Sequence, residues 1–181
     1  PWHPHGDETE GSYDGEVAFV DRQVARLVRW LEERGALEET VVVAVADHGE
    51  GLGDHGPIEH GYLLHEEVLH VPWIMAGPGV SAGHRVPSLV ALEDLQPTVL
   101  GLLRIPSGRV QGRSLVPALS RDEIPSGISY AETDLPWTGY RWAPQRSLTS
   151  VDWKYVRTPW TELYDREADR RELCLLYTST L

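Results

Sequence analysis

Residues 41–61 read VVVAVADHGEGLGDHGPIEHG, so that an unbroken apolar run passes into a loop rich in glycine, acidic residues and histidine. The apolar part extends from Thr40 to Ala46 and consists mainly of β-branched residues. A short run of this kind predicts a strand that is buried on both faces of a mostly parallel sheet. Because ligands gather at the carboxyl ends of strands in open α/β sheets, we expect Asp47 and His48 to lie at a binding site.

The segments around this strand predict an α/β fold. Upstream, apolar residues recur at steps of three and four, which predicts an amphipathic helix that ends near Gly35: Val17, Val20, Val24, Leu27 and Leu31. Downstream, residues 70–77 are predicted to form a second strand. Residues 89–103 are predicted to contain a helix that opens around Asp94 and Pro97, because proline is tolerated in the first turn. After Pro106, short β-prone pieces separated by proline and glycine predict a small C-terminal antiparallel β part. We therefore expect helices to flank a mostly parallel sheet, followed by an antiparallel region.

Composition narrows the classes of partner. The 181 residues carry a formal net charge of −12, which argues against nucleic acid or an anionic membrane surface as the main partner. No segment approaches the roughly 18 consecutive apolar residues of a membrane-spanning helix. The single cysteine, Cys174, excludes an internal disulfide framework and an all-cysteine zinc site.

Asp47 and His48 offer a carboxylate oxygen and an imidazole nitrogen, a mixed pair that suits a divalent cation such as calcium, manganese or zinc. Two ligands do not complete a metal site. The alternative is that Asp47 caps a following helix and His48 bonds to the backbone, as polar residues at the end of a strand often do.

The wider pattern resembles a known family. The strings ADHGEGLGDHG, EHG and EEVLHVPWIMAGPG are similar to those of the sulfatases of the alkaline-phosphatase superfamily. The similarity continues through ALEDLQPTVLGLLRIP, VQGRSLVPAL, WKYVRTP and ELYDREADRRE, so that it covers nearly all of residues 1–172. Such an ordered succession is far more specific than any single motif.

The resemblance implies an alkaline-phosphatase-like fold and a metal-dependent hydrolase of sulfate esters. Asp47 and His48 match two of the four residues that hold one divalent cation in the family, with calcium favoured and manganese as the alternative. His60 falls where the family binds the sulfate group, although a structural role in the loop is the alternative. His5 resembles a histidine that contacts the leaving group, with His3 as the other candidate. Glu50, Asp54 and His55 are expected to fix the loop.

Two departures from the family concern the nucleophile and the chain's ends. The family's formylglycine arises in a Cys/Ser-x-Pro-x-Arg motif, which this sequence lacks, and Cys174 is not followed by the required proline and arginine. The resemblance therefore implies a C-terminal fragment that is inactive alone, with the nucleophile and two metal ligands in a missing N-terminal part. Residues 1–105 would be the C-terminal half of the catalytic α/β domain and residues 106–172 a C-terminal antiparallel β subdomain. The apolar ending raises the hypothesis that residues 173–181 are non-native.

The implied substrate is a small sulfate ester or a sulfated glycan. The same kind of site accepts other tetrahedral anions, so a phosphonate monoester or phosphodiester hydrolase is the alternative within the enzyme class. A non-catalytic metal-binding module is the alternative outside it. The aromatic stretch from Leu135 to Trp142 is expected either to line the cleft or to pack against its surroundings.

Overall fold

The computed structural model describes residues 13–56, 58–120 and 124–180, which form two compact units. One unit contains the described residues through Val42 together with residues 76–78, and the other contains residues 43–75 and the described residues from Gly79 onward. In the described part of the chain, no helix has both the length and the apolar character needed to cross a membrane. The predicted division of the chain at residues 105 and 172 stays a prediction.

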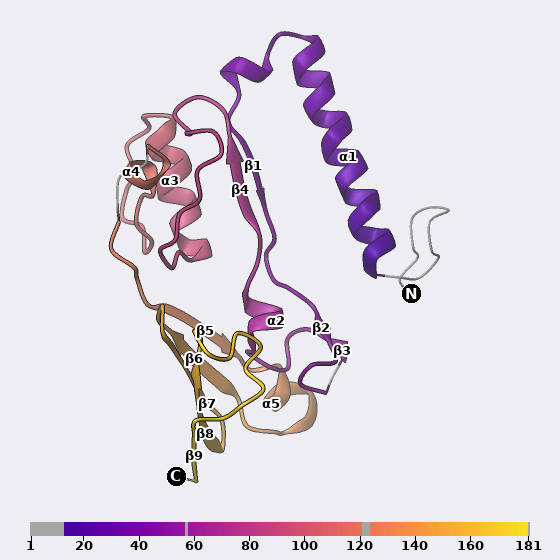
Figure 1. Ribbon diagram of the computed structural model, residues 1–181, viewed down its shortest axis with the longest axis vertical. Coiled ribbons are helices and arrows are strands. Elements are labelled where there is room, and N and C mark those ends of the chain that lie inside the picture. The colour runs from indigo at the N-terminus through magenta and orange to yellow at the C-terminus, as the bar shows by residue number, and fades with distance from the viewer. Residues whose placement is uncertain (1–12, 57, 121–123, 181) are drawn as a thin grey trace. The chain divides into compact units, whose positions relative to one another are not determined.

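The first unit consists mainly of α1, Tyr13–Glu33 (Figure 1), which confirms the predicted amphipathic helix. Its first turn contains Asp14, whose charge is favourable near the positive end of the helix dipole. Gly35 follows at a φ of +63°, a left-handed conformation that ends helices readily when the residue is glycine. A short 3-10 helix, η1, Leu37–Glu39, then leads into β1.

The strands β1, Val42–Val45, and β4, Trp73–Ala76, are hydrogen-bonded neighbours. They are antiparallel: the Ala46 N–H donates to the Pro72 carbonyl at one end, and Gly77 lies against Thr40 at the other. The mostly parallel sheet predicted from the apolar runs is therefore not confirmed. β1 is half-buried rather than fully buried in the described structure. An unbroken apolar run favours a strand with both faces covered, but it contains no information on which neighbours cover the strand or on strand direction.

The loop after β1 folds back as a short antiparallel pair, β2, Gly51–Leu52, and β3, Ile58–Glu59. The loop lies against α2, Glu66–Leu69, because the Gly49 N–H donates to the Val68 carbonyl over 2.7 Å. A Cβ atom on Gly49 would lie only 2.2 Å from the Glu67 carbonyl oxygen. Glycine is therefore required at Gly49 for this close approach.

The segment between β4 and the C-terminal sheet contains η2, Leu92–Asp94, α3, Leu95–Leu102, and α4, Val116–Leu119. The predicted helix, expected to open around Asp94 and Pro97, is confirmed: α3 begins at Leu95, directly after Asp94. Buried Asp94 accepts the backbone N–H groups of Ala91 and Arg113, which fixes the entrance of α3.

The C-terminal region is a five-stranded antiparallel sheet in the order β5-β6-β7-β8-β9 (Figure 1), which confirms the predicted antiparallel part. Its strands are β5, Ser129–Thr133; β6, Gln145–Thr149; β7, Trp153–Arg157; β8, Trp160–Asp165; and β9, Tyr177–Thr180. A short helix, α5, Leu135–Tyr140, connects β5 to β6. The backbone of residues 177–180 pairs with β8, and the hypothesis that this tail is non-native stays a hypothesis.

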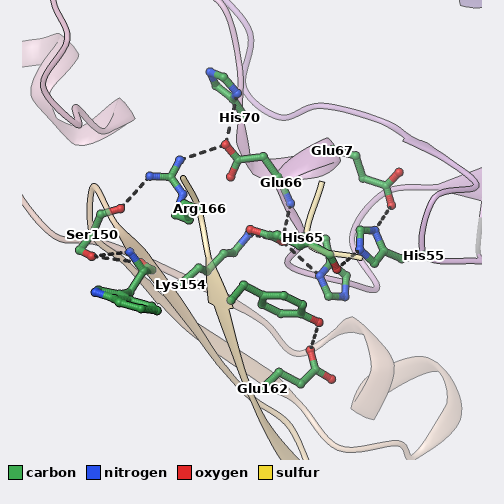
Figure 2. Close-up of polar contacts among 12 residues, drawn as sticks. His55, His65, Glu66, Glu67, His70, Ser150, Lys154, Glu162 and Arg166 are labelled. Atoms are coloured by element: carbon green, nitrogen blue, oxygen red, sulfur yellow. Dashed lines mark hydrogen bonds and ion pairs between the residues drawn. The ribbon is translucent and has the colours of Figure 1, made fainter. Parts of the chain in front are cut away.

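A buried polar network joins the C-terminal sheet to α2 and the loop that precedes it (Figure 2). Lys154 of β7 is fully buried, and its ammonium nitrogen lies 2.9 Å from Oε1 of the buried Glu172. Glu172 also accepts the Glu66 backbone N–H over 2.9 Å and lies 3.3 Å from Nδ1 of His65. Burial lowers the pKa of Lys154, and the attraction of Glu172 only partly offsets this. Burial raises the pKa of Glu172, but three interactions together outweigh burial and lower the pKa overall: the hydrogen bond from His65, the charge and hydrogen bond of Lys154, and the Glu66 N–H.

Candidate functional site

Asp47 and His48 lie together directly after β1. The Nε2 atom of His48 is 3.8 Å from Oδ2 of Asp47, so both polar groups are directed to the same region. The Asp47 side chain is 90% exposed and that of His48 is 42% exposed. Asp47 Oδ1 accepts the backbone N–H of His48 over 3.1 Å, which leaves Oδ2 available for a ligand.

The imidazole of His48 has one nitrogen engaged and one available. Its Nδ1 lies 2.8 Å from the Gly49 carbonyl oxygen, a pure acceptor, so the hydrogen resides on Nδ1. Nε2 then presents a lone pair beside the Asp47 carboxylate. A backbone bond that fixes the tautomer in this way is a common feature of metal-binding histidines. In the sequence analysis, a bond from His48 to the backbone was the alternative to metal binding. In the structure this bond uses only Nδ1, so it is compatible with metal binding through Nε2.

A carboxylate oxygen and an imidazole lone pair side by side fit a divalent cation such as calcium or manganese. They supply only two ligands. Within residues 13–56, 58–120 and 124–180, the structure contains no cluster of three or more histidine, cysteine or acidic side chains that could hold a metal ion.

His60 follows β3 directly and lies beside His48. Its ring stacks on His48 with centroids 4.1 Å apart and an angle of 28° between the planes. Its Nδ1 lies 3.2 Å from both carboxylate oxygens of Glu50, which orients the ring. Within the described residues, Nε2 makes no hydrogen bond. The loop thus brings Asp47, His48 and His60 together. His5 and His3, the other predicted contacts, lie outside the described residues.

Asp54 and His55 attach the loop to other elements rather than to Asp47 or His48. Asp54 accepts two hydrogen bonds from Arg171. These bonds are the largest cause of the lowered pKa of Asp54. His55 lies 3.1 Å from a Glu67 carboxylate oxygen through Nδ1 and 3.0 Å from the Glu172 carbonyl through Nε2. Its ring also stacks on His65 at 3.7 Å (Figure 2). These contacts hold the tip of the loop in place.

The sequence did not indicate Lys154 and Glu172 as residues that position the loop. Glu172 lies in an acidic turn 124 positions after His48, and Lys154 is the only lysine in the chain. Glu172 contacts His65 and Glu66, which are 107 and 106 positions away in the sequence. Local periodicity cannot indicate contacts over such distances. One feature of the sequence could have indicated Lys154. It is the chain's single lysine and occupies a position in the β-prone segment where the side chain would face inward, and a buried charge requires a partner.

The comparisons with known proteins establish the family. The family model described as Sulfatase matches residues 6–105, more than half of the chain, and the chain belongs to this family. An arylsulfatase K of Danio rerio is 32% identical over 151 residues, which are 80% of this chain and 28% of that protein. An arylsulfatase K of Homo sapiens is 28% identical over 89% of this chain and 32% of its own length. The chain thus spans about a third of the length of these curated relatives.

Solved structures show the same fold. A 2-O GAG sulfatase superposes with a TM-score of 0.78 at 27% identity, covering 90% of this chain and 36% of that one. A protein solved in complex with its substrate D-glucosamine-2-N,6-O-disulfate gives a TM-score of 0.74 at 26% identity, over 91% of this chain and 35% of that one. The phosphonate monoester hydrolase of Agrobacterium radiobacter gives 0.75 at 26% identity, over 90% and 36%. The fold is therefore that of the alkaline-phosphatase-like sulfatases, and the family is one of sulfuric ester hydrolases.

Proposed function

We propose that this chain supplies two metal ligands and one substrate contact to the active site of a metal-dependent hydrolase of sulfate esters. The observation that carries the proposal is the available Nε2 of His48, which lies 3.8 Å from the exposed carboxylate oxygen of Asp47. Asp47 and His48 would hold the cation, with calcium favoured and manganese the alternative. A divalent cation at this position would polarise the sulfate oxygens and neutralise charge that develops during cleavage.

His60 is assigned to the substrate. Its stacking on His48 places the ring beside the metal pair, and Glu50 holds its Nδ1. An N–H at Nδ1 donates to Glu50, and the remaining nitrogen can exchange a hydrogen bond or a proton with an ester oxygen. The family's nucleophile motif occurs nowhere in the 181 residues, so formylglycine is assigned to sequence outside them. By the same reasoning, these residues alone are expected to be inactive.

A phosphonate monoester or phosphodiester hydrolase is the second candidate. The observation in its favour is the TM-score of 0.75 with the Agrobacterium radiobacter phosphonate monoester hydrolase, similar to the values for the sulfatases. A site that combines a cation with imidazole donors binds tetrahedral anions of sulfur or phosphorus. The two functions therefore share Asp47, His48 and His60 and differ only in the preferred ester.

The test uses the protein encoded by the whole gene, assayed with 4-nitrophenyl sulfate and 4-nitrophenyl phenylphosphonate in the presence of calcium or manganese. Asp47→Asn and His48→Ala should each abolish turnover and reduce the bound metal measured by mass spectrometry. His60→Ala should lower turnover and leave the metal content intact. His84→Ala, which alters an exposed histidine elsewhere, is the matched control.

The relative rates with the two esters distinguish the first candidate from the second. Metal binding that depends on Asp47 without turnover of either ester would instead support the non-catalytic module. Turnover that is unaffected by Asp47→Asn would refute the assignment of the metal site. Metal-dependent turnover by the 181 residues alone would refute the proposal that the nucleophile lies outside them.

A further inference from the structure

An exposed aromatic surface lies next to the candidate site. Tyr140 and Trp142 stack with centroids 5.0 Å apart, and the ring of Tyr62 lies 5.8 Å from that of Tyr140. Tyr140, the last residue of α5, is 55% exposed, and Trp142, two positions further on, is 63% exposed. Tyr62 lies only two positions after His60, the candidate substrate contact. We refer to Tyr62, Tyr140 and Trp142 as the aromatic surface.

The local backbone builds this surface. Arg141 has a φ of 60°, and this left-handed residue ends α5 by turning the chain back on itself. The Trp142 N–H then donates to the Pro136 carbonyl over 3.0 Å, which brings the indole back beside Tyr140. A bulky residue in the left-handed region is uncommon and is maintained only when the surrounding structure fixes it. The stacked pair is therefore held in place before any ligand binds.

The segment that carries the pair is fixed to the loop that carries His60. The hydroxyl of Thr133, at the end of β5, donates to the Gly61 carbonyl over 2.5 Å. Gly61 has a φ of +87°, and a Cβ atom there would lie 2.9 Å from a methyl group of Leu135. A hydrogen bond with Tyr140 raises the pKa of Tyr62, which adds a polar link between the two segments. The segment that carries Tyr140 and Trp142 is thus joined to the loop at Gly61 and Tyr62, the two residues that follow His60.

The chemistry of the surface suits a sugar. Each of its side chains combines a flat apolar face with a polar edge, a phenol hydroxyl or an indole N–H. A pyranose ring has the same combination, because one face exposes C–H groups and the rim bears hydroxyls. Arg141 provides an exposed guanidinium, 5.3 Å from the ring centroid of Trp137, to meet a sulfate or carboxylate. Glu59 lies near enough to Tyr62 to raise the pKa of its phenol and offers an acceptor for a sugar hydroxyl.

We propose that Tyr62, Tyr140 and Trp142 bind a sugar ring of a sulfated glycan and position its sulfate ester beside His60, with Arg141 contacting an anionic group of the glycan. The proposal rests on the function proposed above, for which it names the substrate class. It assigns the aromatic stretch from Leu135 to Trp142 to substrate binding rather than to packing.

The experiment measures binding by isothermal titration calorimetry, with the protein encoded by the whole gene and two probes. One probe is a heparin-derived tetrasaccharide, and the other is inorganic sulfate, which is too small to reach the aromatic surface and His60 together. Trp142→Ala should raise the Kd for the tetrasaccharide by about fivefold to tenfold, and Trp142→Phe by less. Neither variant should change the Kd for inorganic sulfate. Trp160→Ala removes an indole of similar exposure, 57%, from β8 and should change neither Kd.

The outcomes separate this proposal from the previous one. Turnover of 4-nitrophenyl sulfate together with equal tetrasaccharide affinity in Trp142→Ala and wild type would overturn the saccharide surface and leave the proposed function standing. Tetrasaccharide binding that depends on Trp142, without turnover of any ester, would overturn the proposed function and support the saccharide surface. If the folded protein does not bind the tetrasaccharide and Trp142→Ala converts a dimer to a monomer in size-exclusion chromatography, the surface is an interface between copies, and the proposal is wrong.

Discussion

Replacing Lys154 with methionine tests whether the buried polar network holds the C-terminal turn in place. The substitution keeps the length of the side chain but removes the ammonium that lies 2.9 Å from Oε1 and 3.0 Å from Oε2 of Glu172. The Glu172 carboxylate would then be buried with only the Glu66 N–H and His65 as partners. Removal of one partner of a buried ion pair typically costs about 3–5 kcal/mol, because the remaining charge is left uncompensated. We expect Lys154→Met to lower the free energy of unfolding by this amount, a large part of the ~5–15 kcal/mol typical of a domain.

The measurement is urea unfolding at pH 7 followed by far-UV circular dichroism, with linear extrapolation to water. The double variant Lys154→Met/Glu172→Gln removes both charges but keeps an acceptor for the Glu66 N–H, and it should recover at least half of the loss. Arg171→Met breaks the solvent-exposed pair with Asp54 and serves as the control, for which we expect a far smaller change. The reasoning would be refuted if Lys154→Met and Arg171→Met destabilised the protein equally, or if the double variant were less stable than Lys154→Met.

Three further predictions follow from particular contacts. The pKa of Glu172 is lower in the folded protein than the ordinary value of 4.5, so the ionised carboxylate stabilises the folded state at pH values above 4.5. This stabilisation is lost as the pH falls through the folded-state pKa. Urea unfolding at a series of pH values should show this acid loss in wild type and a smaller one in Lys154→Met/Glu172→Gln. Gly49→Ala should destabilise the protein by at least about 1–3 kcal/mol, because its Cβ would lie 2.2 Å from the Glu67 carbonyl oxygen. Gly139→Ala, in α5 with nothing within 4 Å of a Cβ, should instead stabilise it by about 0.5–1 kcal/mol, and equal effects of the two in urea unfolding would contradict the reasoning. Gly77→Ala should increase sensitivity to limited proteolysis, because Gly77 has a φ of +123° and a Cβ atom there would lie 2.3 Å from the Thr40 carbonyl oxygen. Protease resistance equal to that of wild type would contradict this, since it would mean that β4 can shift without penalty.

The sequence was sufficient for the elements that have a strong local pattern. The amphipathic stripe of α1 and the apolar run of β1 are both present in the structure. The direction of β4 was not predictable, because its apolar alternation is the same in either orientation. The half-buried state of β1 was not predictable either, since burial depends on which neighbours cover a strand.

The candidate site was predictable to the extent that its residues are close in the sequence. Asp47, His48 and His60 lie in one loop, and the glycines of that loop allow a fold that brings His60 back to Asp47 and His48. The proximity of Tyr140 to Tyr62 was not predictable, because the segments that carry these residues meet through a contact between Gly61 and Thr133, which are 72 residues apart. The roles of Asp47, His48, His60 and His5 stay predictions.

The long-range polar network has a consequence for the order of folding. The hairpins of β5 to β8 join residues close in the chain, so that their loop-closure entropy is small and they can form early. The bonds from Glu172 to His65 and Glu66 close loops of 107 and 106 residues, and they need the turn after β8 to be in place first. The loop that carries Asp47, His48 and His60 therefore acquires its final anchorage among the last steps. We therefore expect the C-terminal sheet to form before this loop during refolding. A newly made chain would have its sheet complete before His48 and His60 reach their final positions.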